Sequence, residues 1–257
     1  FAGFLSRAID TTKVNLSALK EVCIAFGGCT AKQSGSINVL AGASITKVSD
    51  SHTSLVMNAE GSLNIEGSIL GANTTPLNVI LQSNTSVVVA AFASVRAENI
   101  RISAPTIEDS GSLFAYGSSH SGGPFMALFA TRLVITGRLR SGSKENPGSI
   151  QIQGNDDVIV RDASISIDGE EGGLISINSL GNVQISNAEI LTNGGNGRGG
   201  SLDIVAGNVT INSSILEANG ATDGGQIQII ANLRDVNFQQ SLIQTNGSNG
   251  LGGTILL

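Results

Sequence analysis

The chain has 257 residues, of which 40% are hydrophobic, 13% are charged and 33 are glycine, and its formal net charge is −6. One tyrosine and no tryptophan exclude a large aromatic core, and the composition fits thin β-layers joined by tight turns. The basic residues form no stripe, which argues against a nucleic-acid partner. No apolar run reaches the roughly 18 residues of a membrane-spanning helix.

The N-terminal segment, residues 1–33, differs from the rest of the chain. Residues 11–22 place apolar side chains mostly on one side of a helix, with threonines available as an N-cap; these apolar residues are Val14, Leu16, Leu19, Val22 and the following Cys23. A stack of repeats needs its open apolar end covered. We therefore expect a short helical cap or an inter-segment joint here.

Two cysteines, Cys23 and Cys29, flank the short stretch Ile-Ala-Phe-Gly-Gly. A loop with two glycines can close into a disulfide, which an extracellular protein would allow. A metal site would need further ligands, and His52 and His120 are distant in sequence. The spacing favours a disulfide over free or buried thiols.

Residues 34–121 carry an irregular version of a β pattern, in which a small-residue corner precedes an alternating apolar segment. Such segments begin at Ser34, Ala41, Thr53 and Glu60. We interpret Asn99–Ile102 and Gly111–Ala115 as the second and third strands of one coil. Residues 72–76 and 103–109 are expected to bulge from corners as insertions, which is where solenoids often carry function.

Residues 122–257 are more regular, because a Gly-Gly step, once replaced by Pro147–Gly148, returns at nearly constant spacing. The second residues of these steps are separated by 25, 25, 27, 25 and 28 positions; they are Gly123, Gly148, Gly173, Gly200, Gly225 and Gly253. A period in the twenties with strand-like content indicates a solenoid.

Each regular repeat holds three short alternating segments. In the repeat that begins at Gly148 they are Ser149–Ile152, Val158–Val160 and Ile165–Ile167. The connections are too short for the crossover helix of an open parallel sheet, and parallel crossovers are overwhelmingly right-handed. The chain is therefore predicted to be an all-β, right-handed parallel β-helix of eight or nine coils. Three parallel sheets would run along it, with a rise of about 4.8 Å per coil.

An Asn-Gly pair follows the third segment in three successive repeats, at Asn193, Asn219 and Asn246. Asparagine and glycine tolerate the left-handed conformation of a sharp corner, and stacked asparagines can hydrogen-bond along a ladder. We predict a structural corner ladder in preference to a ligand site.

Acidic residues cluster at Asp156, Asp157 and Asp162, and again at Asp168 and Glu170–Glu171. Many β-helices are polysaccharide lyases or hydrolases that use carboxylates on an outer sheet. Gly154–Asp157 superficially resembles the paired-aspartate motif of polygalacturonase-type hydrolases. No Gly-His-Gly or Arg-Ile-Lys follows it, so the first cluster is expected to be a solvated corner, and no metal or cofactor is predicted.

The repeat pattern Gly-Gly-x-Leu/Ile-x-Ile, Val-x-Ile and Ile-Leu-x-x-Asn-Gly, as in residues 193–204, resembles the large filamentous-haemagglutinin-type exoproteins of bacteria. The resemblance covers residues 122–257 well. It implies an extended secreted or surface fibre that acts in adhesion and is exported through an outer-membrane partner. The Asn-Pro-Asn motifs of that family's export domain are absent, which implies a stalk or binding segment, and no site residue transfers.

These features together predict a non-enzymatic segment of a secreted or surface-exposed β-helical fibre. Its partners would be a host or matrix surface, or neighbouring copies in a filament. The alternative is a carbohydrate-active β-helix enzyme that uses the acidic cluster near Asp157. The last Gly-Gly step, Gly252–Gly253, opens a coil that Leu257 leaves unfinished, so we expect a helix that is open at this end and belongs to a longer assembly.

Overall fold

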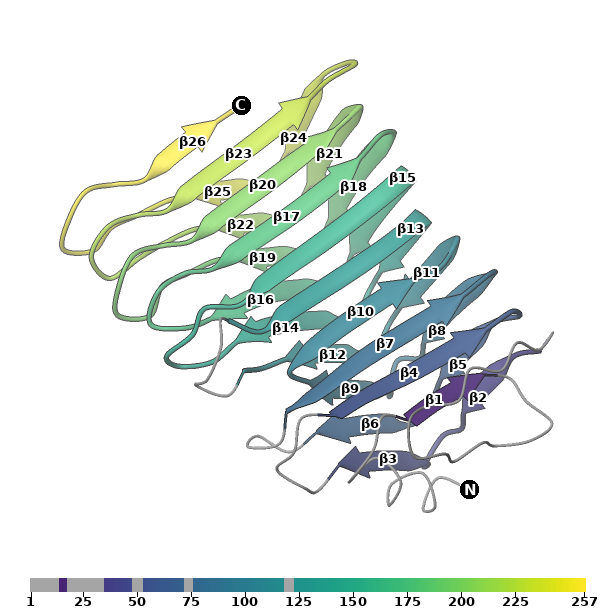
Figure 1. Cartoon of the computed structure of the whole chain (residues 1–257). Helices are drawn as coiled ribbons and strands as arrows, with labels where there is room; N and C mark the ends of the chain where they lie inside the picture. The colour runs from purple at the N-terminus through teal and green to yellow at the C-terminus, as the bar shows by residue number, and fades with distance from the viewer. Residues whose placement is uncertain (1–13, 18–34, 48–52, 72–75, 118–122) are drawn as a thin grey trace.

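The computed structural model describes residues 14–17, 35–47, 53–71, 76–117 and 123–257, and every regular element within them is a β-strand. The strands wind into a solenoid of about eight turns. In Figure 1 the front strands run towards the upper right while the coils advance towards the upper left, which defines a right-handed coil. The prediction of an all-β, right-handed parallel β-helix is confirmed.

Each coil presents three faces. The first face contains β1 (Val14–Ser17), β4 (Thr53–Ala59), β7 (Leu77–Ser83), β10 (Asn99–Ser103), the first parts of β13 (Phe125–Ile135) and β15 (Ser149–Arg161), β17 (Leu174–Ser179), β20 (Ser201–Ala206), β23 (Gln226–Ala231) and β26 (Thr254–Leu256). The second face contains β2 (Ile37–Val39), β5 (Leu63–Ile65), β8 (Ser86–Val89), β11 (Thr106–Asp109), the last parts of β13 and β15, β18 (Asn182–Ser186), β21 (Asn208–Asn212) and β24 (Val236–Gln239). The third face contains β3 (Ser44–Lys47), β6 (Ser68–Gly71), β9 (Ser94–Ala97), β12 (Ser112–Ala115), β14 (Arg138–Gly142), β16 (Ser164–Asp168), β19 (Glu189–Leu191), β22 (Ile215–Glu217) and β25 (Leu242–Gln244).

The three faces form two hydrogen-bonded sheets, whereas three separate sheets were expected. The third face is a nine-stranded parallel sheet, and the first two faces belong to one 17-stranded sheet. They are joined because β13 and β15 continue through the first corner. The register between these strands shifts after the pair Ala130 and Gly154, so that Arg132 faces Asp157. A bulge therefore absorbs the bend without ending the strand.

The core consists of inward side chains stacked from coil to coil. On the first face, Val79, Ile100, Met126, Ile150 and Ile175 are paired in register along successive strands, and all are at most 1% exposed. Each buried aliphatic side chain contributes about 1.5 to 3 kcal/mol. The alternating pattern of each strand thus fixes which residues remain on the outer surface.

Part of the expected N-terminal helix is a strand. Val14–Ser17 forms β1 and pairs in parallel with β4, because its alternating Val14 and Leu16 suit a strand as well as a helix. The remainder of residues 1–33, including Cys23 and Cys29, lies outside the described residues.

Two assignments in the irregular half are wrong. Asn99–Ser103 pairs with β7 and with the first part of β13, so it lies on the first face and not the second. Residues 106–109, expected to lie in an insertion, form β11 and occupy the second face between β8 and β13. The other expected insertion, residues 72–76, lies outside the described residues except for Pro76. Glu98 alone separates β9 from β10. The sequence therefore has no glycine-rich loop at this point to indicate that the chain passes from the third face to the first face of a new coil.

The repeated anchor glycines are required by backbone stacking at the third corner, where the chain returns from the third face to the first. A Cβ atom built on Gly173 would collide with the carbonyl oxygen of Gly148, the equivalent residue one coil earlier. The same collision with the preceding anchor's carbonyl occurs at Gly200, Gly225 and Gly253. At Gly123 the carbonyl belongs to Pro147, and at Gly148 the obstacle is Ser141 and the Gly142 backbone. The Gly-Gly period thus records close contact between coils.

The left-handed corner of the regular coils is the second one, between the second and third faces. Four non-glycine residues there have φ angles of 49° to 51°: Asp162, Asn187, Ser213 and Gln240. Gly194, Gly220 and Gly247, which follow the corner asparagines, do not have positive φ. Left-handed geometry is therefore the wrong explanation for the Asn-Gly pairs; their glycines are needed because a Cβ would meet a carbonyl oxygen within the same loop.

Candidate functional site

Asp157, the central residue of the acidic cluster, takes part in a ladder between coils. Its Oδ1 accepts a hydrogen bond of 2.8 Å from the side-chain amide of Asn182, whose own Oδ1 accepts one of 2.7 Å from Asn208. The three residues are paired in register at the start of the second face. The carboxylate is therefore engaged in holding three coils together.

The other two members of the cluster, Asp156 and Asp162, do not form a catalytic pair with Asp157. Asp162 occupies the left-handed second corner and accepts a hydrogen bond of 3.3 Å from Asn187. It follows Asp157 by the length of a strand, about 17 Å of extended chain, whereas the carboxyl groups of glycosidases lie about 5 to 9.5 Å apart. Asp156 is exposed, and its backbone carbonyl accepts a hydrogen bond from Ser179. The fold does not bring Asp157 and Asp162 together as a catalytic pair.

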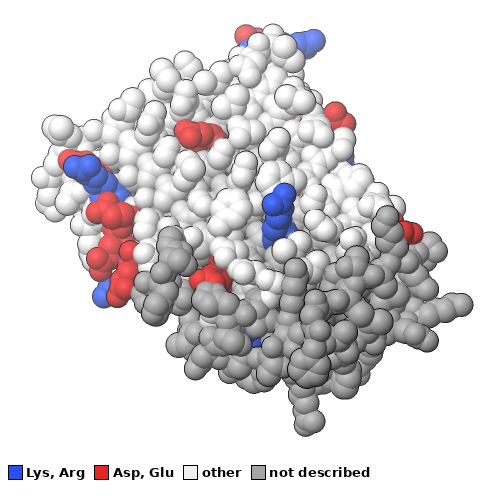
Figure 2. Space-filling view, in the orientation of Figure 1, with Lys and Arg blue, Asp and Glu red and all other residues white. Residues whose placement is uncertain are grey.

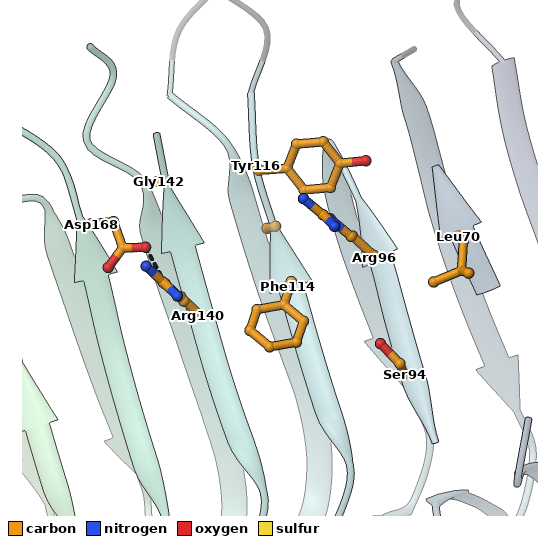
Figure 3. Close-up of a pocket in the computed structure, with 9 residues that line it drawn as sticks. Leu70, Ser94, Arg96, Phe114, Tyr116, Arg140, Gly142 and Asp168 are labelled. Carbon is orange, nitrogen blue, oxygen red and sulfur yellow. Dashed lines mark hydrogen bonds and ion pairs between the residues drawn. The ribbon is translucent and has the colours of Figure 1, made fainter. Parts of the chain in front are cut away.

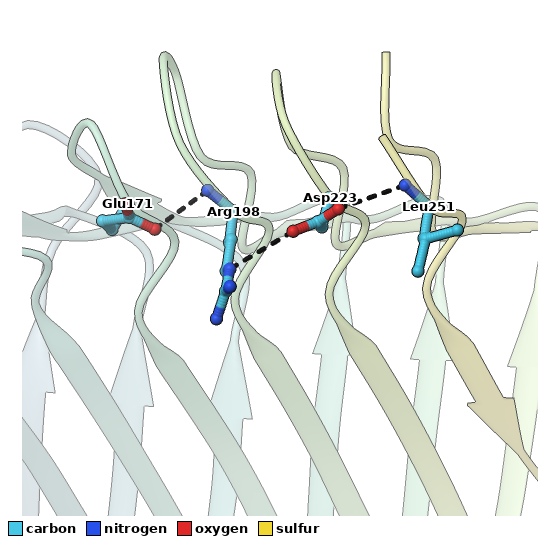
Figure 4. Close-up of polar contacts among 4 residues, drawn as sticks. All are labelled: Glu171, Arg198, Asp223 and Leu251. Carbon is cyan, nitrogen blue, oxygen red and sulfur yellow. Dashed lines mark hydrogen bonds and ion pairs between the residues drawn. The ribbon is translucent and has the colours of Figure 1, made fainter. Parts of the chain in front are cut away.

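Acidic side chains at the third corner bind the loop of the following coil (Figure 4). Glu171 accepts a hydrogen bond of 2.9 Å from the backbone N–H of Arg198, and Asp223 accepts one of 3.1 Å from that of Leu251. The Arg198 guanidinium lies 3.3 Å from the Asp223 carboxylate. The second acidic cluster is engaged as well, because Asp168 pairs with Arg140, and Glu170 with Lys144 at 3.9 Å.

The three corner asparagines form a ladder next to these contacts. The side-chain oxygen of Asn193 accepts a hydrogen bond of 2.7 Å from the backbone N–H of Asn219, and Asn219 does the same for Asn246. The side-chain amide of Asn193 donates to Glu217 at 2.9 Å. The side-chain oxygens therefore bind the backbone of the next coil, and the ladder is not built from bonds between asparagine side chains.

A hollow of about 460 Å³ lies on the outer surface of the third face (Figure 3), and of its lining residues sequence reasoning singled out only Asp168, as part of the second acidic cluster. Its lining combines two arginines, two aromatic rings and one carboxylate with a leucine and three small residues: Leu70, Ser94, Arg96, Phe114, Ala115, Tyr116, Arg140, Gly142 and Asp168. The strands β6, β9, β12, β14 and β16 supply nearly all of them. Apart from the buried Ala115 and Gly142, these are outward-facing residues of adjacent coils, so the hollow is built by coil stacking.

The side chains in this hollow are arranged by specific contacts. The Arg96 guanidinium lies 4.7 Å from the centre of the Tyr116 ring, a cation–π geometry. The Tyr116 hydroxyl donates a hydrogen bond to the carbonyl of Gly71, and the Arg140 guanidinium donates to Asp168. Burial raises the pKa of the Tyr116 hydroxyl, with Arg96 acting in the opposite direction. The aromatic ring and both arginines are thus held in place.

The first face offers a contrast, because it is nearly uncharged. Figure 2 shows this face with few blue or red side chains and with charges gathered mainly at its edges. Its outward positions in the regular coils are mostly serine, asparagine and glutamine, such as Gln151, Ser176 and Gln228, with Asp203 as a charged exception. A second hollow, of about 490 Å³, lies where the first face turns into the second and is lined by uncharged residues around Phe129. Of these two hollows, only the one on the third face is lined by charged side chains.

Asp109 is a buried acidic residue that the sequence did not single out. It occupies an inward position of β11 between Val89 and Ile135 and is 1% exposed. Its Oδ1 accepts a bond of 3.2 Å from the Gly111 N–H, and its Oδ2 has no partner. Burial raises the pKa of this carboxyl to about 7, although the Gly111 hydrogen bond lowers it. The group is a source of instability when charged.

In comparisons with protein-family models, curated proteins and solved structures, no match was found for this chain. Within the described ranges, no group of three or more histidine, cysteine, aspartate or glutamate side chains is placed to hold a metal ion. No helix in that same part of the chain is long and apolar enough to cross a membrane.

Proposed function

We propose that this chain is a non-enzymatic segment of a secreted or surface-exposed β-helical fibre, which acts in adhesion or in the assembly of a filament or matrix. Its partners would be a host or matrix surface or neighbouring copies. The proposal extends the sequence resemblance to filamentous-haemagglutinin-type exoproteins.

The main support is that the acidic residues form structural hydrogen bonds between coils. Asp157, Asp162 and Glu171 all accept hydrogen bonds from the next coil, so they act as structural links along the rod. A catalytic acid and base would instead need to converge on one substrate position. Further support comes from the first face, whose uncharged polar side chains suit contact with a surface better than acid-base chemistry.

The carbohydrate-active enzyme is the competing hypothesis, and one pair of assays separates the two. Beads coated with the purified chain are tested for adhesion to layers of matrix glycans and proteins, with heat-unfolded chain as the control. In parallel, soluble polysaccharides are incubated with the chain and the release of reducing ends is measured. We expect adhesion by the folded chain and no release.

Asp157→Asn makes the second assay decisive. The asparagine retains an oxygen that can accept the Asn182 hydrogen bond, so the fold should persist while any acid-base function of the carboxylate is lost. Release of reducing ends by the original chain and its loss in this variant would refute the adhesive proposal in favour of the enzyme.

A further inference from the structure

We infer that the third-face hollow binds a linear acidic polysaccharide whose chain runs along the solenoid axis, across successive coils. This inference rests on the proposed function, since it assigns a ligand class to one contact surface of the adhesive fibre, on the third face and separate from the uncharged first face. Arg96, Phe114 and Arg140 would be the principal contacts, with Tyr116 supporting Arg96.

The register of the third face places these three side chains in one column. Arg96 on β9 is paired with Phe114 on β12, and Phe114 with Arg140 on β14. Adjacent strands lie about 4.8 Å apart, so the backbone positions of the two arginines are separated by about 10 Å. The result is a cationic, aromatic and cationic sequence of groups along the direction in which the rod extends.

The chemistry of the column matches acidic sugars. Sugar rings present flat C–H surfaces that stack on aromatic rings, and Phe114 is only half-buried, between two exposed arginines. Arginine binds carboxylates and sulfates through two parallel hydrogen bonds. A chain of acidic sugars can satisfy both kinds of group at once.

One arginine of the hollow, Arg140, already binds a carboxylate of the chain itself, that of Asp168. Asp168 lies one strand further on, at β16, and receives the Arg140 hydrogen bond (Figure 3). This pair is solvent-accessible, with 51% of the Arg140 side chain and 35% of the Asp168 side chain exposed. Exposed ion pairs are weak, so an incoming carboxylate can exchange with Asp168.

An acidic peptide fits the column less well. In an extended peptide, side chains on one face recur about every 7 Å, which does not match two arginines whose backbone positions lie about 10 Å apart with an aromatic residue between them. A peptide made of aspartate and glutamate also has no ring whose flat C–H face could stack on Phe114. We therefore favour a polysaccharide as the occupant.

The test measures binding of three probes by titration calorimetry: oligogalacturonate, its methyl-esterified neutral form, and an oligoglutamate of the same charge. Oligogalacturonate should bind at least tenfold more tightly than either of the others. Equal binding of oligoglutamate would overturn the polysaccharide assignment, and equal binding of the neutral form would overturn the role of the arginines.

Variants locate the site. Arg96→Gln and Arg140→Gln should each weaken oligogalacturonate binding about tenfold, and Phe114→Ser by a similar factor. Asp168→Asn should strengthen it several-fold, because Arg140 loses its internal competitor. Arg132→Gln, which removes the same charge from the second face, is the matched control and should leave the affinity unchanged, while circular dichroism verifies the fold of every variant.

The bead assay distinguishes this inference from the proposed function. Adhesion that survives Arg96→Gln and Arg140→Gln, together with unchanged oligogalacturonate affinity, would overturn the acidic-polysaccharide site and leave the adhesive fibre standing. Cleavage of oligogalacturonate would instead contradict the non-enzymatic proposal.

Discussion

The coils after Gly123 and the coils before it are built on the same three faces but are stabilised differently. In the later coils, polar side chains at the corners form hydrogen bonds to the next coil, and the repeated glycines allow the backbones of adjacent coils to lie in close contact. In the earlier coils these ladders are sparser, and the described charged residues that are buried, Lys47, Glu98 and Asp109, all lie there.

The third-face hollow also begins in the irregular half and ends where the regular coils start. On either side of the column formed by Arg96, Phe114 and Arg140, the equivalent position holds an uncharged residue: Leu70 before Arg96 and Ser166 after Arg140. The residues that repeat from coil to coil thus stabilise the stacking of the coils. The residues that depart from the repeat provide charged and aromatic side chains on the outer surface.

The largest expected effect comes from breaking the glycine stacking of the regular half. Gly173→Ala would place a Cβ atom against the Gly148 carbonyl, and backbone cannot move aside without separating two coils. We expect the free energy of unfolding to fall by about 5 kcal/mol, measured by urea denaturation. The control is Gly252→Ala, whose Cβ would lie 3.9 Å from its nearest neighbour, the Thr245 carbonyl oxygen; equal loss in both variants would refute the stacking explanation.

The next largest effect concerns Asp109 in the irregular half. Its pKa is about 7 in the folded chain against an ordinary value of 3.8, so the folded state binds the proton more tightly than the unfolded state. Stability should therefore fall as pH rises from about 4 to about 7 and then level off, by on the order of 4 kcal/mol. Urea denaturation across this pH range measures the change.

Asp109→Val provides the matched variant, because valine continues the inward column between Val89 and Ile135. It should remove most of this pH dependence and stabilise the chain above pH 7. An unchanged pH profile would show that Asp109 is not the responsible group.

The regular half of the fold could be predicted because its pattern reports directly on packing. Inward aliphatic residues alternate in each segment, and the anchor glycines mark each return to the first face. The irregular half misled the same reasoning at two points. A single residue, Glu98, replaces the third corner, and Asp109 takes an inward position where an apolar residue was expected, so β11 did not read as a strand.

The third-face hollow could not be read from the sequence because its residues are brought together by register. Phe114 and Arg140 are 26 residues apart, as in the regular repeat, but Arg96 and Phe114 are only 18 apart, so the regular spacing does not connect all three. One signal was present, since each residue ends a similar triplet: Ser94–Arg96, Ser112–Phe114 and Arg138–Arg140. Aligning the third strands in place of the glycines would have placed the three side chains in one column.

The smallest expected effect compares one asparagine contact from each half. Asn219→Ala removes the side-chain oxygen that accepts a 2.7 Å hydrogen bond from the Asn246 backbone, whereas Asn64→Ala removes only a side-chain bond of 2.7 Å to Asn38. We expect a loss of about 1 kcal/mol for Asn219 and a few tenths for Asn64, because a backbone N–H left unpaired at a corner weakens the joint between coils. Parallel urea titrations measure both. Equal losses would mean that the ladders of the regular half do not bind its coils more firmly than the isolated contacts of the irregular half.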